Sequence, residues 1–187
     1  MKTRTVTIFF IMILAVSTAQ SDIVRTDIGT NQSPGWIPTA DHLPSDLRHF
    51  LEGADEFTLY SLDPGQESKE TNTFFHLAIL GQIKIEQGAE RTNLVTSLSD
   101  GIAEGGQMAD CFNPRHGIRA LKNGVAVDFV ICFECGEIKA ISSKGSNWDF
   151  PVSRKPAAIF NSVLKNAHVP LPSEKKGAKA FTFAPSF

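Results

Sequence analysis

The sequence predicts an α+β domain with an antiparallel sheet of about five strands and helices packed on one face. Residues 107–142 follow a β-like pattern almost without interruption, with an Asn-Gly turn near the middle. Helical periodicity is confined to three separate stretches, at 44–52, 91–103 and 156–167. Because the strands are grouped rather than alternating with helices, an antiparallel sheet is favoured over a parallel one.

The first half of the domain begins with the helix at 44–52, where Pro suits the first turn and Gly53 can end it. A strand is predicted at 56–62, followed by a turn at Asp63-Pro64-Gly65. Residues 74–86 predict another strand, bent at Gly81, where a β-bulge would fit.

The second half contains the other two helices and most of the strands. The helix at 91–103 has an apolar face, and Gly101 weakens its last turn. The helix at 156–167 begins with Pro and turns one apolar face inward. That face consists of Ile159, Phe160, Val163 and Leu164.

The first 19 residues have the three parts of a secretory signal peptide. Lys2 and Arg4 form a basic start, an apolar run covers 6–16, and small residues at 17–19 precede the expected cleavage site. The apolar run is shorter than the roughly 20 residues that a membrane-spanning helix needs. We therefore expect a periplasmic or secreted product with no membrane span after cleavage.

Beyond 1–19, the chain divides into a flexible leader at 20–43, a single α+β domain at 44–172 and a C-terminal tail at 173–187. The whole chain has 18 Lys and Arg against 20 Asp and Glu, a net charge of −2. No basic patch marks a nucleic-acid-binding surface, so we expect no nucleic-acid partner. The expected partner is an unidentified ligand or another envelope protein.

The most specific local signal is Asn123-Gly124, which favours a two-residue type I′ turn between two strands. The register that follows places Arg119 opposite Asp128, a favourable cross-strand charge pair. The strand at 125–133 is apolar on both faces near its end, which is typical of a central strand. Asp128 is therefore expected to be partly buried, with Arg119 as its partner.

All three cysteines lie at 111–135, and the predicted hairpin brings Cys111 and His116 beside Cys132 and Cys135. Cys-x-x-Cys-Gly is the form of a metal knuckle, and these four residues would make a Cys₃His zinc site, so zinc is the one candidate cofactor. The register argues against it, because His116 falls opposite Ile131 and points to the face away from Cys132.

A disulfide is the alternative use of the same residues, because exported proteins meet an oxidising compartment. Extending the hairpin register places Cys111 diagonal to Cys135, which predicts a Cys111–Cys135 bond with Cys132 as a buried free thiol. Such a bond closes a loop of about 25 residues and contributes about 3 kcal/mol in the chain-entropy model. Buried thiols with no special role are also compatible with the sequence.

A redox-active Cys-x-x-Cys is a third hypothesis. Thioredoxin-like motifs place the first Cys at a helix N-terminus, which lowers the pKa of its thiol. Here Cys132 ends a strand and the chain continues as another strand, so the context disfavours this use.

Arg115 and His116 follow Pro114 at the start of the hairpin and are candidates to bind a small anion or a carboxylate. The alternative is that they anchor the loop through backbone carbonyls. No Ser lies in a nucleophile elbow and no phosphate-loop motif is complete, so no catalytic residue is nominated. We expect a non-enzymatic binding or structural domain with a cysteine-stabilised hairpin. A zinc-binding protein is the second hypothesis, and an enzyme or thiol redox protein built on the same residues is the third.

The stretch Cys-Phe-Asn-Pro-Arg-His-Gly-Ile-Arg at 111–119, followed by Val-Asp-Phe-Val-Ile-Cys-Phe-Glu-Cys at 127–135, resembles a family of uncharacterised secreted or lipid-anchored bacterial proteins. Tyr-Ser-Leu-Asp-Pro at 60–64 and the closing helix before 169–171 are also similar. The resemblance implies a bacterial envelope protein and implies no biochemical activity.

Overall fold

The computed structural model describes residues 36–37, 41–67 and 72–173. The expected signal peptide, most of the expected leader and nearly all of the expected tail lie outside the described residues. What is described includes almost all of the predicted α+β domain and all three cysteines.

The strands form one sheet in the order β1-β8-β7-β6-β5-β2-β4-β3. They are β1 (Trp36–Ile37), β2 (Glu56–Glu67), β3 (Thr73–Phe74), β4 (Leu77–Lys84), β5 (His116–Lys122), β6 (Val125–Cys132), β7 (Glu137–Ser142) and β8 (Asn147–Pro151). Seven of these strands pair antiparallel, and the two-residue β1 adds a parallel bridge to β8. The antiparallel sheet is confirmed, whereas the expected number of about five strands is too low.

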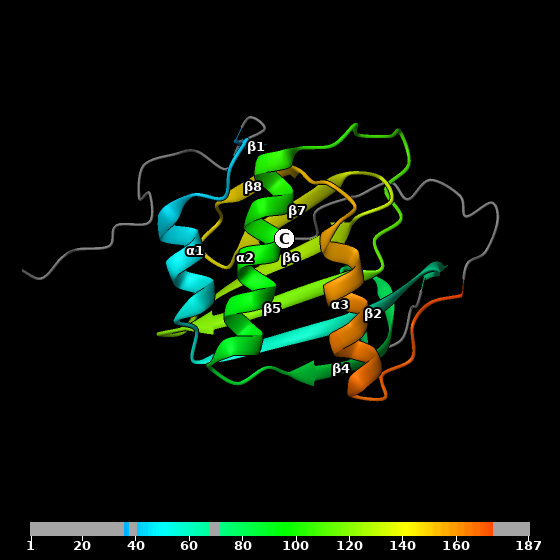
Figure 1. Cartoon of the computed structure of the whole chain (residues 1–187), viewed down its shortest axis with the longest axis horizontal. Helices are drawn as coiled ribbons and strands as arrows, with labels where there is room; N and C mark the ends of the chain where they lie inside the picture. The colour runs from blue at the N-terminus through cyan, green and yellow to red at the C-terminus, as the bar shows by residue number, and fades with distance from the viewer. Residues whose placement is uncertain (1–35, 38–40, 68–71, 174–187) are drawn as a thin grey trace, which may run out of the picture.

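In the described part of the chain, three helices cover one face of this sheet, as predicted (Figure 1). They are α1 (Ser45–Glu52), α2 (Ala89–Glu104) and α3 (Pro156–Asn166). The main core lies between the helices and the sheet, where Leu51, Leu98 and Phe160 from the helices and Phe57 and Phe129 from the strands are essentially inaccessible. Burial of this apolar face is what holds the helix layer on the sheet.

The turn predicted at Asp63-Pro64-Gly65 is wrong, because β2 continues to Glu67. Asp63 Oδ1 accepts a hydrogen bond from the Gly65 N–H at 2.8 Å, and the pairing with β4 shifts register between Asp63 and Glu67. The turn-forming residues 63–65 therefore produce an irregularity within β2 and do not reverse the direction of the chain.

The single strand predicted at 74–86 is divided into β3 and β4. Phe75 and His76 separate the two strands, and both have positive φ angles, of 53° and 65°. The predicted bulge is confirmed, because Ser61 pairs with Gly81 whereas Leu62 pairs with Ile79.

The β5–β6 hairpin has the predicted register. Asn123 and Gly124 have φ angles of 50° and 74°, as a type I′ turn requires. Arg119 lies opposite Asp128 and donates to its carboxylate from Nε and Nη2, both at 2.7 Å. The Asp128 side chain is only 14% exposed, which confirms that it is partly buried.

Both faces of the central strand β6 are buried, because a second, smaller core lies on the face opposite the helices. Val127, Phe129 and Ile131 belong to the main core, whereas Val130 and Cys132 belong to the second one. The second core consists of Tyr60, Leu62, Phe74, Leu77, Phe112, Val130, Cys132 and Cys135.

The close approach of α2 and α3 explains Gly101, which the helix pattern alone marks as a weakness. A Cβ atom at Gly101 would overlap the ring of Pro156 at the start of α3 and lie 3.3 Å from Val152 Cγ2. Glycine therefore permits the contact between these helices.

We predict that Gly101→Ala destabilises the protein, although alanine is the better helix former. The overlap with Pro156 should cost about 1–3 kcal/mol, which outweighs a gain in helix propensity of about 1 kcal/mol. Asn93→Ala, at an exposed position of the same helix, is the matched control and should be neutral or slightly stabilising. Urea unfolding measures both effects, and an increase in the stability of Gly101→Ala would contradict the explanation.

Candidate functional site

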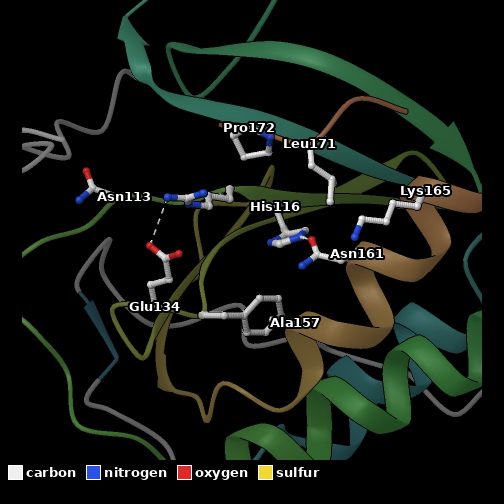
Figure 2. Close-up of a pocket in the computed structure, with 10 residues that line it drawn as sticks. Asn113, His116, Glu134, Ala157, Asn161, Lys165, Leu171 and Pro172 are labelled. Atoms are coloured by element: carbon white, nitrogen blue, oxygen red, sulfur yellow. Dashed lines mark hydrogen bonds and ion pairs between the residues drawn. The ribbon is translucent and has the colours of Figure 1, made fainter. Parts of the chain in front are cut away.

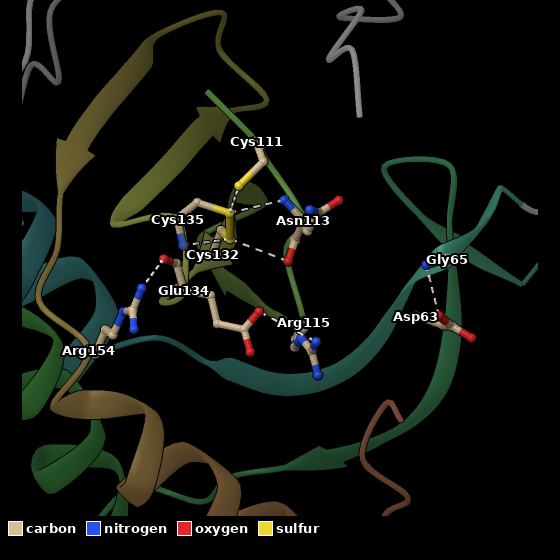
Figure 3. Close-up of polar contacts among 9 residues, drawn as sticks. All are labelled: Asp63, Gly65, Cys111, Asn113, Arg115, Cys132, Glu134, Cys135 and Arg154. Atoms are coloured by element: carbon tan, nitrogen blue, oxygen red, sulfur yellow. Dashed lines mark hydrogen bonds and ion pairs between the residues drawn. A yellow bond between two sulfur atoms is a disulfide. The ribbon is translucent and has the colours of Figure 1, made fainter. Parts of the chain in front are cut away.

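The three cysteines lie together, but their pairing differs from the prediction (Figure 3). The disulfide joins Cys132, at the end of β6, to Cys135, with an S–S distance of 2.10 Å. Cys111 is the free cysteine, and its Sγ lies 3.7 Å from Cys135 Sγ. The predicted Cys111–Cys135 bond and the predicted free Cys132 are therefore wrong for this structure.

The physical reason lies in the path of the chain after β6. A Cys111–Cys135 bond requires the hairpin ladder to continue beyond Cys132, but the chain turns through 133–136 and enters β7. This turn brings the Cα atoms of Cys132 and Cys135 to 5.2 Å, within disulfide range. Cys111 remains beside the pair because the Ala109 N–H donates to Cys135 O at 2.9 Å.

The four residues of the predicted zinc site are not assembled, because His116 lies on the helix-facing side of the sheet. Its ring packs against Phe133 and Phe160, with centroids at 5.2 and 5.8 Å. The side-chain alternation that argued against this site is confirmed by the pairing of His116 with Ile131. Within the described residues, no group of three or more His, Cys, Asp or Glu is placed to hold a metal ion.

Arg115 and His116 instead line a cavity of about 200 Å³ on this side of the sheet (Figure 2). Its walls come from the start of β5, the turn at 133–134, helix α3 and the segment at 171–172. The helix contributes Ala157, Asn161 and Lys165, which follow one another at intervals of four residues and so share a face.

His116 is the most buried polar group of this cavity, with a relative exposure of 4%. Its Nε2 lies 2.9 Å from Asn161 Oδ1 and donates to it, whereas Nδ1 is buried without a hydrogen-bond partner. Burial lowers the pKa of His116 to about 4. The charge of Arg115 also lowers this pKa, whereas the hydrogen bond to Asn161 raises it. At neutral pH the ring is therefore neutral, and Nδ1 is an acceptor.

Arg115 provides the positive charge next to this neutral ring. Its Nη2 lies 3.4 Å from Glu134 Oε2, and its Nε is buried without a hydrogen-bond partner. The Arg115 side chain is 19% exposed, whereas the Glu134 side chain is 57% exposed. Lys165 adds a second, exposed cation at the rim, so the cavity offers more positive than negative charge.

The disulfide and the cavity share one short loop. Phe133 and Glu134 line the cavity and lie between the two bonded cysteines. Arg154 Nη2 donates to the carbonyl oxygen of Glu134 at 3.0 Å, which further restrains this loop (Figure 3). The disulfide therefore constrains one wall of the cavity.

Sequence reasoning missed Asn161, Lys165, Phe133 and Glu134 as companions of Arg115 and His116. The spacing of Asn161 and Lys165 was a usable signal, because two polar residues four apart mark one polar face of a helix that is otherwise apolar on its inner side. Only the position of α3 over β5 shows that this face meets His116.

No protein-family model, curated protein or solved structure matches the chain. The expected relation to secreted or lipid-anchored bacterial proteins therefore stays a prediction. In the part of the chain that the structure describes, no helix has both the length and the apolar character needed to cross a membrane.

The buried His116 predicts a pH-dependent stability. Its folded-state pKa of about 4 lies below its ordinary value of 6.5, so the unfolded chain binds more protons between these values. The free energy of unfolding should therefore fall by about 3 kcal/mol as the pH drops from 6.5 to 4.

Urea unfolding across this pH range tests that expectation. His116→Gln should flatten the pH dependence, whereas Asn93→Ala, which changes no titratable group at an exposed position of α2, should leave it unchanged. Equal slopes for the wild type and His116→Gln would show that His116 does not titrate as described.

Proposed function

We propose that this chain is an exported, non-enzymatic binding domain whose cavity at Arg115 and His116 takes a small carboxylate that also carries a hydroxyl or amino group. The observation that carries the proposal is one cavity lined by the partly exposed side chain of Arg115 and the buried ring of His116. Arg115 Nε and His116 Nδ1 have no hydrogen-bond partner and are buried, so a ligand must uncover them to reach them. An unmet buried polar group costs about 1–3 kcal/mol, which a complementary ligand recovers.

The two nitrogens require different ligand groups. Arg115 Nε is a donor, and a guanidinium matches a carboxylate in charge and in geometry. His116 Nδ1 is an acceptor while the ring is neutral, so it needs an O–H or N–H from the ligand. A hydroxy- or amino-carboxylate meets both needs in one small molecule.

The cations around the cavity favour an anionic ligand over a neutral one. Lys165 stands at the rim, and the ion pair of Arg115 with Glu134 is long, at 3.4 Å. Because Glu134 is more than half exposed, a ligand carboxylate competes for Arg115 against a solvated partner rather than a buried one.

The proposed location is the periplasm or the outside of a bacterial cell. The signal-peptide pattern at 1–19 supports export. The Cys132–Cys135 disulfide also supports it, since such bonds persist in oxidising compartments.

We predict that Arg115→Gln weakens binding of a small hydroxy-carboxylate by about 10-fold or more, because a charge-assisted hydrogen bond is lost. Isothermal titration with lactate, malate and succinate measures this, and succinate tests whether a ligand hydroxyl matters. Lactate and malate should bind more tightly than a carboxylate of similar size that lacks the hydroxyl.

Lys155→Gln is the matched control, because it removes the same charge from an exposed residue that pairs with Glu104. It should leave the affinity unchanged. The proposal fails if none of these carboxylates binds at millimolar concentration, or if both substitutions reduce the affinity equally.

A further inference from the structure

The chain has three cysteines, and the structure holds them as a disulfide with a third thiol in contact. Cys111 Sγ lies 3.7 Å from Cys135 Sγ, about the contact distance of two sulfur atoms. Cys132 and Cys135 are each only 1% exposed, whereas Cys111 is partly exposed. Cys135 thus has two neighbouring sulfurs, one bonded to it on the buried residue Cys132 and the other on the partly exposed residue Cys111 (Figure 3).

The backbone around the disulfide suits either pairing. The Cys135 N–H donates to Cys132 Sγ at 3.1 Å, and the Asn113 N–H donates to Cys135 Sγ at 3.3 Å. Asn113 O lies 3.3 Å from Cys132 Sγ. If the bond to Cys132 were broken, the Cys132 thiolate would keep the hydrogen bond from the Cys135 N–H. Once protonated, the Cys132 thiol could donate to Asn113 O.

We propose that Cys111 is the exchange thiol of this site, through which the buried disulfide reacts with external small thiols. In the first step the Cys111 thiolate attacks Cys135 Sγ. The Cys111–Cys135 bond forms, the Cys132–Cys135 bond breaks, and the electron pair leaves on Cys132. Cys132 takes up the proton that Cys111 gave up, so the step needs no oxidant or reductant.

The external reaction follows from the difference in exposure. The rearranged disulfide would join Cys111, which is partly exposed in this structure, to Cys135, which is buried. An external thiolate attacks Cys111 Sγ and releases Cys135 as a thiolate. A second external thiolate attacks the mixed disulfide, so an external disulfide forms and Cys111 is released. Two external thiols are oxidised, and one protein disulfide is reduced to two thiols.

Proximity is the physical basis of this assignment. A thiol held against a disulfide reacts as part of one molecule, which gives a large advantage over a thiol in free solution. This inference concerns the opposite face of the sheet from the carboxylate cavity and does not depend on that function.

Single serine substitutions test the two pairings. After oxidation in air, Cys132→Ser should form a Cys111–Cys135 bond, and Cys111→Ser should keep the Cys132–Cys135 bond. Cys135→Ser should keep two free thiols, because Cys135 is the shared partner. Intact mass and thiol counts measure each result, and a Cys132→Ser protein that folds but keeps two free thiols overturns the proposal.

A kinetic measurement tests it without removing the disulfide. Glutathione should reduce the disulfide of Cys111→Ser at least about 10-fold more slowly than that of the wild type, because the accessible route is lost. Urea unfolding of the same two proteins checks that they are equally stable. Equal reduction rates at equal stability overturn the proposal, even if Cys132→Ser does not fold.

Discussion

The pairing of β5 with β6 in a single register decides where each candidate functional residue lies. A slip of one residue would move every side chain of a strand to the other face of the sheet. The type I′ turn at Asn123-Gly124 and the bidentate Arg119–Asp128 ion pair both specify the observed register. The apolar side chains of β6 reinforce it, because both of its faces are buried in cores.

This register places the cavity residue His116 and the disulfide cysteine Cys132 on opposite faces of the sheet. His116 projects toward α3 and the cavity, whereas Cys132 projects into the second core on the other face. The loop at 133–134 connects them, since it lies between the bonded cysteines and forms a wall of the cavity. A change of cysteine pairing would therefore act directly on the loop that forms this wall of the cavity.

The arginines of the domain differ in ways that distinguish structural from binding roles. Arg91 is buried and donates from Nη1 and Nη2 to the carbonyl oxygens of Ala54 and Ile85, and Arg154 donates to Glu134 O. Carbonyl anchoring of this kind is the alternative role for Arg115. Arg115 instead faces a carboxylate at 3.4 Å and lines a cavity, which is the arrangement expected of a group that meets an anionic ligand.

The sequence by itself determined the features that depend on neighbouring residues: three helices, the Asn-Gly hairpin with its register, and the alternation that directs His116 away from Cys132. The Asn-Gly turn preference and side-chain periodicity act over a few residues, so they can be read directly. The turn preference of Asp63-Pro64-Gly65 did not decide the path of the chain, because β2 continues through it to pair with β4. Only the tertiary structure decided that short strands such as β8 complete the sheet, that Cys135 pairs with Cys132, and that Asn161 meets His116. These contacts depend on where the chain turns after β6 and on how α3 crosses the sheet, and the packing of the whole core sets both.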